Sequence, residues 1–227
     1  MFGIVQTKLE YFFYFRTEFR RKCRYASYIH LFFAVWVMGY LKERIKHVFR
    51  FRHKRGYGVH SPFMFHLILY VIRDKEKRFA YPEAWEKSKA LKAREKKVFR
   101  LLSRLIRHLQ VRQVVCLGGC AGLLKEYLVQ VCGKTAIQEN VPGGLEQADF
   151  VYVGRGAGEF LPEGFLGEPM LEGKPGYLVV ADIYRNPFNA RIWRTYRERA
   201  TVSVDMMRFG LLIFDDKVQK GKYYLKI

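Results

Sequence analysis

Short apolar runs separated by polar, helix-length segments dominate the chain from residue 111 onward. Four of these runs are rich in Val, Ile or aromatic residues and lie next to turn residues, a pattern typical of buried strands. They are Val111–Gly119, Thr135–Asn140, Ala148–Gly154 and Gly176–Ile183. Amphipathic segments follow the first and the fourth run, over about Leu123–Val131 and Asn189–Arg199. This alternation predicts parallel strands joined by helical crossovers.

The end of the chain has a different pattern. The segments TVSVDMM, GLLIFDD and KYYLKI follow one another with only short polar links. Links of this length predict antiparallel strands joined by turns. The sequence therefore predicts an α/β sheet that is covered by helices on both faces and ends in an antiparallel hairpin.

Helices are predicted before the first strand, over residues 38–110. Ser61 suits a helix N-cap, and Pro62 follows at the first helical position, where its missing N–H costs nothing. This helix is expected to run from Pro62 to about Arg73. A long basic helix with an apolar inner face is expected over Lys87–Leu109.

Residues 1–37 differ from the rest of the sequence and form an N-terminal appendage. Basic residues precede the apolar run Tyr25–Leu41, whose 17 residues fall below the ~20 that a spanning helix needs. The run could be an uncleaved membrane anchor or a helix that lies on a membrane surface. Another interpretation is that the protein starts at Met38, which opens an amphipathic helix. Its apolar face contains Leu41, Ile45, Val48 and Phe49.

The chain is strongly basic, with 41 Lys and Arg against 21 Asp and Glu, a net charge of +20 and a pI near 9.9. This charge favours nucleic acid or an anionic membrane surface as a partner, with a protein that merely has basic exposed faces as the alternative. The four cysteines have neither CxxC nor zinc-finger spacing, so no metal site is predicted. Cys116 and Cys132 lie in apolar runs typical of buried thiols. A reduced, cytoplasmic setting fits this usage.

The candidate chemistry lies where the predicted strands end. The stretch VVCLGGCAG runs from a strand into Gly118, Gly119 and Gly122, which let the backbone turn tightly and approach a nucleotide-like cofactor. Glu139 ends the next strand, where an acid can hydrogen-bond a ribose diol, although a solvated loop acid is the alternative. Asp182 ends a later strand, at the edge where open sheets bind ligands. It could orient a substrate, bind a metal or cap the following turn.

His60 raises a separate question, because it directly precedes the Ser61–Pro62 helix start. It is either a catalytic residue that faces a substrate or a packed residue beside the helix cap. The helix-start chemistry of Ser61 and Pro62 favours the second interpretation.

The order of these motifs resembles that of a bacterial family of class I S-adenosylmethionine-dependent methyltransferases. The matching segments are HSPF, CLGGCAG, Glu139, ADFVYVG, VVADI and SVDMMRFGLLIF, over about Met38 to Ile227. The resemblance implies a Rossmann-like domain over residues 111–227 that binds S-adenosylmethionine. It also implies the roles of individual residues: Gly118, Gly119, Gly122 and Glu139 hold the cofactor, and Asp182 and His60 face the methyl acceptor.

The chain departs from this family at several positions. Cys116 stands where an acid usually opens the Gly turn, near the methionine amino group. Gly154 and Arg155 replace an Asp-Gly pair, and one of the paired acids before the last helix is Ala181. Only nine residues separate Glu139 from Asp149. Because a crossover with its helix needs at least ~10–12 residues, the sheet is expected to lack one edge strand.

Two functions therefore remain open from the sequence. The first is a methyltransferase with an unknown acceptor, for which the basic charge makes an anionic molecule such as RNA a candidate. The second is a non-catalytic protein of the same fold that binds nucleic acid, a membrane surface or a protein. Either would be cytoplasmic, with peripheral or N-terminal membrane association as a possibility. The sequence does not specify an oligomeric state.

Overall fold

The computed structural model describes residues 38–47, 49, 58–74, 78–89, 91–161, 165 and 175–225. The chain divides into two compact units, Met1–Lys46 and His47–Ile227. The predicted appendage, residues 1–37, lies outside the described residues. The described part of the smaller unit is helical from residue 38, as its amphipathic pattern predicts.

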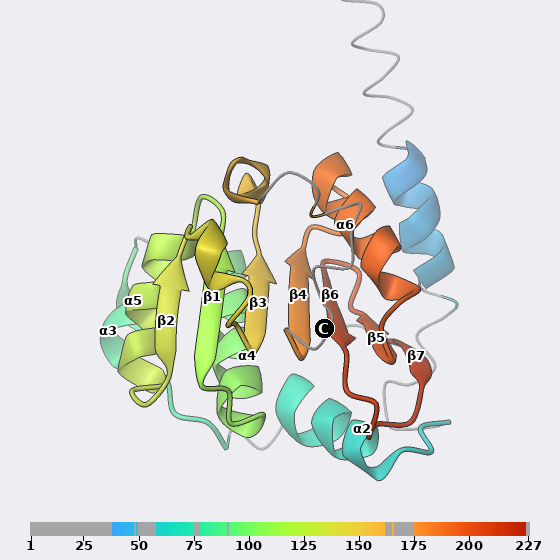
Figure 1. Cartoon of the computed structure of the whole chain (residues 1–227), viewed down its shortest axis with the longest axis horizontal. Helices are drawn as coiled ribbons and strands as arrows, with labels where there is room; N and C mark the ends of the chain where they lie inside the picture. Colours follow the sequence, from blue (N-terminus) through green and yellow to red (C-terminus); the bar gives the residue numbers. More distant parts are fainter. Residues whose placement is uncertain are drawn as a thin grey trace, which may run out of the picture. The chain divides into compact units, whose positions relative to one another are not determined.

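Within the described part of the larger unit, seven strands form one mixed sheet with the order β2-β1-β3-β4-β6-β5-β7 (Figure 1). The strands are β1 (Gln113–Leu117), β2 (Ala136–Glu139), β3 (Phe150–Val153), β4 (Tyr177–Ala181), β5 (Val202–Asp205), β6 (Phe209–Ile213) and β7 (Gly221–Tyr224). The first four of these strands are parallel to one another, as predicted. The architecture is an α/β fold that is compatible with a Rossmann-like domain.

The order of the parallel strands reverses at β1. The chain leaves β1 through helix α5 (Ala121–Val131) and returns as β2 on one side of β1, whereas β3 pairs with the other side. At such a reversal the loops after neighbouring strands diverge and leave a crevice at the carboxyl ends of the strands. The topology therefore favours ligand binding at the edge where β1 and β3 end.

The last three strands confirm one prediction and correct another. β6 is antiparallel to both β4 and β5, which confirms the predicted hairpin. β7, however, pairs with β5 in parallel. The chain does reverse its direction after β6, but both edges of β6 are already occupied, so β7 pairs with the free outer edge of β5. β5 and β7 have the same direction, and the prediction that the closing strands are all antiparallel neighbours was wrong.

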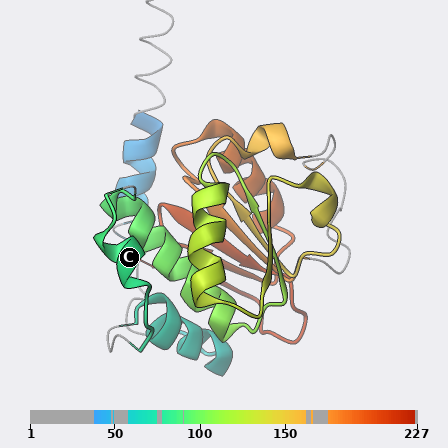
Figure 2. The ribbon, with the colours of Figure 1, turned by 90° about the vertical axis from the view of Figure 1, so that its left-hand side faces the viewer.

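Helices cover both faces of the sheet, as expected from the alternating pattern (Figure 2). Helix α4 (Ala93–His108) and α5 pack on one face, and α6 (Pro187–Arg197) packs on the other. Alternate residues of β1 serve the two cores, since Val114 and Cys116 join the first and Val115 and Leu117 join the second. Both cores contain side chains of β1, β3 and β4, and their removal from water is the main favourable contribution to folding.

The helix predicted from Pro62 is present. It consists of α2 (Pro62–His66) and a π-helical continuation, η2 (Leu67–Ile72). The Ser61 hydroxyl accepts a hydrogen bond from the Met64 N–H at 3.4 Å, which confirms Ser61 as the N-cap. Met64, Leu67 and Ile68 are fully buried in the core that contains α4 and the sheet.

The long basic helix expected over Lys87–Leu109 is wrong at its start. A short helix, α3 (Glu83–Lys87), ends before Ser88, whose backbone is extended, and α4 begins only at Ala93. The Glu95 carboxylate accepts the Lys92 N–H at 2.9 Å, which satisfies a donor that the first helical turn leaves unpaired. Helix α4 therefore begins six residues later than expected, and α3 is a helix that the sequence analysis did not predict. Helix α5 begins at Ala121, two residues earlier than expected, and α6 begins at Pro187, where the sequence predicts a helix start.

The segment between β2 and β3 contains a single 3-10 turn, η3 (Pro142–Gly144). β2 is the last strand on that side of the sheet among the described residues. The short interval between Glu139 and Asp149 thus holds neither a helix nor a strand of its own.

Candidate functional site

The Gly-rich turn after β1 is held between the ends of its two neighbouring strands. The Gly118 N–H donates to Oδ1 of Asn140, the residue after β2, at 2.8 Å. The Gly119 N–H donates to the carbonyl oxygen of Arg155, which follows β3, at 2.9 Å. Gly118 has a φ of +114°, and a Cβ there would lie 2.6 Å from the Arg155 oxygen. Packing within the protein therefore explains Gly118. Gly119 is exposed, and a Cβ there would meet only the same oxygen at 3.8 Å, so a ligand has room to approach this turn even though the Gly119 N–H is already hydrogen-bonded.

Glu139 lies beside the first turn of α5. Its position in the sheet pairs with Cys116, and its Oε2 atom would lie 3.3 Å from a Cβ on Gly122. Gly122 thus leaves room for this carboxylate next to the start of a helix. The structure thus places Glu139 and Gly122, both named as cofactor-binding candidates from the sequence, next to each other.

Cys116 lies near the carboxyl end of β1, between β2 and β3. It is fully buried and pairs in register with Glu139 of β2 and with Tyr152 of β3. Burial, with a smaller contribution from the Glu139 charge, raises the pKa of the thiol to about 12. Cys116 is therefore a neutral thiol at physiological pH and supplies no negative charge to this edge.

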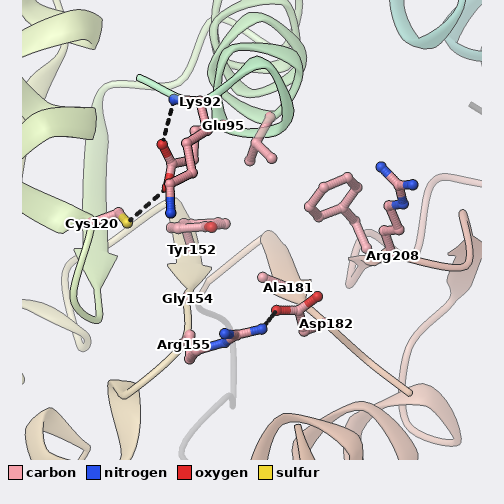
Figure 3. A pocket seen from close by; sticks show the side chains of 11 residues that line it. Lys92, Glu95, Cys120, Tyr152, Gly154, Arg155, Ala181, Asp182 and Arg208 are labelled. Carbon is pink, nitrogen blue, oxygen red and sulfur yellow. Dashed lines mark hydrogen bonds and ion pairs between the residues drawn. The ribbon is translucent and has the colours of Figure 1, made fainter. Parts of the chain in front are cut away.

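A pocket of about 250 Å³ lies at the carboxyl ends of β3 and β4, next to the Gly turn, and Glu139 is not among the residues that line it (Figure 3). Its polar lining residues include Lys92, Glu95, Cys120, Tyr152, Arg155, Asp182 and Arg208. Val98 and Phe209 add apolar surface. The residues come from the start of α4, the Gly turn, the ends of two parallel strands and the β5–β6 turn. This volume is at the small end for ligand sites and suits a small ligand or one end of a larger one.

Asp182 lines this pocket, as its place at a strand end predicts. Its Oδ2 accepts a hydrogen bond from Arg155 Nη2 at 2.8 Å, so the carboxylate is paired with a guanidinium. The backbone of Asp182 has a φ of +50°, a left-handed conformation that residues other than Gly rarely adopt. Its carbonyl oxygen accepts the N–H groups of Arg185 and Asn186 at 2.8 and 2.9 Å, which closes the turn into α6.

Glu95 is a pocket residue that the sequence reasoning missed. Its Oε2 accepts the Lys92 N–H, and Cys120 donates its thiol to Oε1 at 4.0 Å (Figure 3). Burial, followed by the Glu95 charge, raises the pKa of Cys120 and keeps it in the thiol form. A Glu three residues after a helix N-cap was the available signal, but the misplaced start of α4 hid it.

Tyr152 forms part of the pocket wall, where burial raises the pKa of its hydroxyl. A Cβ on Gly154 would lie 3.2 Å from the Tyr152 ring and 2.9 Å from the Leu117 carbonyl oxygen. The space for a side chain at position 154 is therefore closed in this chain.

Asn189 joins the ends of β3 and β4 from α6. Its Nδ2 donates to the carbonyl oxygens of Gly154 and Ala181 at 3.1 and 2.8 Å. The side chain is fully buried, and its Oδ1 has no hydrogen-bond partner among the described residues. Asn189 fixes the spacing of the two strand ends that line the pocket, and no sequence pattern identified it.

His60 is not brought together with Asp182. It is exposed, it precedes the Ser61 cap, and it does not line the pocket. Figure 1 shows α2 toward the end of the sheet where the parallel strands begin. The pocket lies at the other end, where β3 and β4 finish.

The described residues contain no group of three or more His, Cys, Asp or Glu side chains that could hold a metal ion. Among their helices, none combines the length and the apolar character needed to cross a bilayer. The apolar run Tyr25–Leu41 lies mostly outside them.

Comparisons with known proteins found no match. No protein family, curated protein or solved structure is significantly similar to this chain.

Proposed function

We propose that this protein is an S-adenosylmethionine-dependent methyltransferase with a small-molecule site at the carboxyl edge of its sheet. The observation that carries the proposal is the Glu139 carboxylate beside Gly122, next to the strand-order reversal at β1. An acid at the end of the second strand, facing a Gly turn, suits a ribose diol. The hairpin order of β4, β6 and β5 agrees with the resemblance drawn from the motifs.

The residues present fit one end of the cofactor. Gly119 leaves room for a ligand to approach the turn, and Glu139 offers a carboxylate for the ribose hydroxyls. When bound, S-adenosylmethionine supplies a methyl group on a reactive sulfonium. The chain's own task is then to hold two reactants in line and to exclude water, with no enzyme nucleophile required. Asp182, fixed by Arg155, is placed to orient an acceptor in the pocket, and His60 has no part in this arrangement.

The Glu139 assignment can be tested by binding alone. Glu139→Ala is expected to weaken S-adenosylhomocysteine more than about tenfold, because charge-assisted hydrogen bonds to the ribose are lost. Glu126→Ala, which removes an exposed carboxylate of α5, is the matched control. An unchanged affinity of the Glu139 variant would remove the ribose assignment.

A non-catalytic protein of the same fold is a second candidate, favoured by Cys116 and Gly154. The buried thiol cannot act as the missing acid, and the side-chain space at position 154 is closed. Such a protein would bind S-adenosylhomocysteine but transfer no labelled methyl group from S-adenosylmethionine to any fraction of a cell extract. Detected transfer that the Glu139 variant loses would exclude this candidate.

The helix of the smaller unit supports a membrane-surface role in addition. Met38, Leu41 and Ile45 share a face at helical spacing and are 68%, 45% and 60% exposed. Lys42 and Arg44 lie between them in the sequence. Exposed apolar residues with basic neighbours suit a helix that lies on an anionic bilayer.

Vesicle sedimentation tests this membrane role. The full chain should pellet with vesicles of phosphatidylcholine and phosphatidylserine, but much less with phosphatidylcholine alone. Ile45→Ser should reduce pelleting, whereas Val129→Ser, at a 52% exposed aliphatic position of α5, should not. Equal pelleting of both variants would contradict the role, and salt-sensitive RNA binding without vesicle binding would assign the basic charge to nucleic acid instead.

A further inference from the structure

The last turn of α4 carries basic side chains that lie outside the pocket and contact aromatic rings. His108, in that turn, stacks on His66 of α2 with the two ring centroids 5.1 Å apart. The His66 ring also contacts the Tyr70 ring of η2, with a centroid distance of 4.8 Å. The Arg78 guanidinium lies 4.4 Å from the centroid of Tyr70. Direct contacts therefore join four planar side chains that come from three separate stretches of the sequence.

Arg107 extends this cluster beside His108. It is exposed, and its guanidinium lies 5.5 Å from the ring centroid of Phe79, the residue after Arg78. Both series of contacts thus connect the last turn of α4 with residues 78 and 79. The name His–Arg surface is used below for His66, Tyr70, Arg78, Arg107 and His108.

The nitrogen atoms of this surface are open to a partner from outside the chain. His66 and Arg107 are exposed, and neither has a hydrogen bond or an ion pair in the part of the chain that the structure describes. A guanidinium stacked on a ring keeps its N–H groups free at its edge. The ring contacts also fix the planes of these side chains, which lowers the entropy lost when a ligand binds.

Other arginines of α4 have a different role. Arg104 donates to the Ile72 carbonyl oxygen at 3.1 Å and pairs with Asp74 at 3.6 Å. These contacts hold the segment after η2 onto α4. Arg107 has no such acidic partner among the described residues. Cations in a last helical turn also suit the negative end of the helix dipole, but the dipole does not account for the aromatic contacts around them.

The backbone under Tyr70 is unusual as well. Tyr70 belongs to η2, a π-helical segment, and π-helical turns are rare and occur frequently at functional sites. Leu67, Ile68, Val71 and Ile72 of the same segment are buried, whereas Tyr70 is only partly buried. The segment therefore anchors itself in the core and leaves Tyr70 between His66 and Arg78 at the surface.

We propose that the His–Arg surface binds the phosphate backbone of single-stranded nucleic acid. None of its five residues is acidic, and the net charge of the chain is +20. Asp74, whose Oδ1 accepts the Arg78 N–H at 3.0 Å, is already paired with Arg104. Phe65, the residue before His66, is 39% exposed and offers an aromatic face on which a base can stack. An acidic peptide would pair with the guanidinium groups but would make no use of this ring.

This surface is separate from the pocket and from the helix of the smaller unit. Glu95 lines the pocket at the start of α4, and Arg107 lies in its last turn. Twelve residues of α-helix separate them, or about 18 Å at a rise of about 1.5 Å per residue. The inference therefore goes beyond the proposed function and requires neither the cofactor nor a membrane.

Fluorescence anisotropy of full-length protein with a fluorescein-labelled oligouridylate of about twenty nucleotides tests the proposal. At about 50 mM salt, Arg78→Gln and Arg107→Gln are each expected to weaken binding about fivefold, and the double variant about twentyfold. The double variant should also reduce the slope of log affinity against log salt by about 1.4, since each phosphate contact to a single strand contributes about 0.7. Arg107→Lys should keep the wild-type slope, because it retains the charge.

Arg191→Gln combined with Arg194→Gln is the matched control. Both residues are exposed on α6, which packs on the other face of the sheet, so this double variant should bind the oligonucleotide as the wild type does. Equal losses in the two double variants would show binding by overall charge and overturn the proposal. Absence of oligonucleotide binding by the wild type would overturn it too, as would equal affinity for a polyglutamate of matched length.

The result can be distinguished from a failure of the proposed function. The Arg78 and Arg107 variants should keep the wild-type melting temperature and should bind S-adenosylhomocysteine as the wild type does, since both residues lie outside the pocket. Ile45→Ser, which removes an apolar side chain from the helix of the smaller unit, should leave oligonucleotide binding unchanged. A loss of oligonucleotide binding in Ile45→Ser that equals the loss in the Arg78 and Arg107 double variant would contradict the assignment to the His–Arg surface.

Discussion

Arg155 Nη2 donates to Asp182 Oδ2 at 2.8 Å, and this pair connects the residues that follow β3 and β4 at the mouth of the pocket. The Arg155 side chain is 69% exposed and that of Asp182 is 17% exposed. Solvent screens such a pair strongly, so its role is to set the position of the Asp182 carboxylate rather than to stabilise the fold.

Arg155→Gln is therefore expected to lower the free energy of unfolding by less than about 1 kcal/mol. Urea denaturation followed by Trp fluorescence measures this. Lys222→Gln, which breaks the exposed Lys222–Glu198 pair of 3.1 Å, serves as the control and should have a similarly small effect. A loss above about 2 kcal/mol for Arg155→Gln alone would show that the pair holds the strand ends together.

The two glycines Gly154 and Gly119 should respond differently to Ala. A Cβ at position 154 would lie 2.9 Å from a backbone oxygen, whereas one at position 119 would meet nothing closer than 3.8 Å. Gly154→Ala is expected to cost about 1–3 kcal/mol of unfolding free energy. Gly119→Ala should keep the wild-type stability but weaken S-adenosylhomocysteine binding. Equal stability of the two variants would contradict the described packing.

Gly210 of β6 makes room for Trp193 of α6. A Cβ on Gly210 would overlap the ring of Trp193, which is buried. Gly210→Ala should destabilise the protein by about 2 kcal/mol or more, because a packed aromatic ring must move. Gly143→Ala is the control, since no atom lies within 4 Å of its Cβ position. A Gly210 variant with the melting temperature of the Gly143 variant would be inconsistent with this packing.

His108 gives the protein a predictable pH dependence. The rings of His108 and His66 are stacked with their centroids 5.1 Å apart. Burial of His108, followed by the charge of His66, lowers the pKa of His108 below its usual 6.5. The unfolded chain then takes up this proton at a higher pH than the folded chain. The free energy of unfolding should therefore fall as the pH drops below about 6.5, until folded His108 is protonated as well. Urea denaturation at pH 7.5 and 5.5 should show a smaller loss for His108→Gln than for the wild type; an equal loss would contradict the assignment.

Local patterns in the sequence predicted much of this fold. The Val-rich runs predicted β1, β3 and β4, because strands buried on both faces need continuous apolar residues. Ser61 and Pro62 predicted the start of α2 through capping chemistry. Asp182 was placed at the ligand-binding edge by the rule that parallel strands end at one edge of a sheet, and it does line the pocket there.

Features that depend on distant residues could not be predicted in the same way. The parallel pairing of β7 depends on which edge of the hairpin is free, a property of the assembled sheet. The pocket joins Glu95 to Arg208 across more than a hundred residues of sequence, and neither residue stands in a recognisable motif. The start of α4 was misplaced because residues 88–92, which precede it, contain no Gly or Pro that would predict a break.

The central claim is that the carboxyl edge of this sheet binds an S-adenosylmethionine-type cofactor. Calorimetric titration of the full chain with S-adenosylhomocysteine tests it most directly. The account predicts a saturable heat of binding and a rise in melting temperature with ligand concentration. The absence of both at millimolar ligand would contradict it.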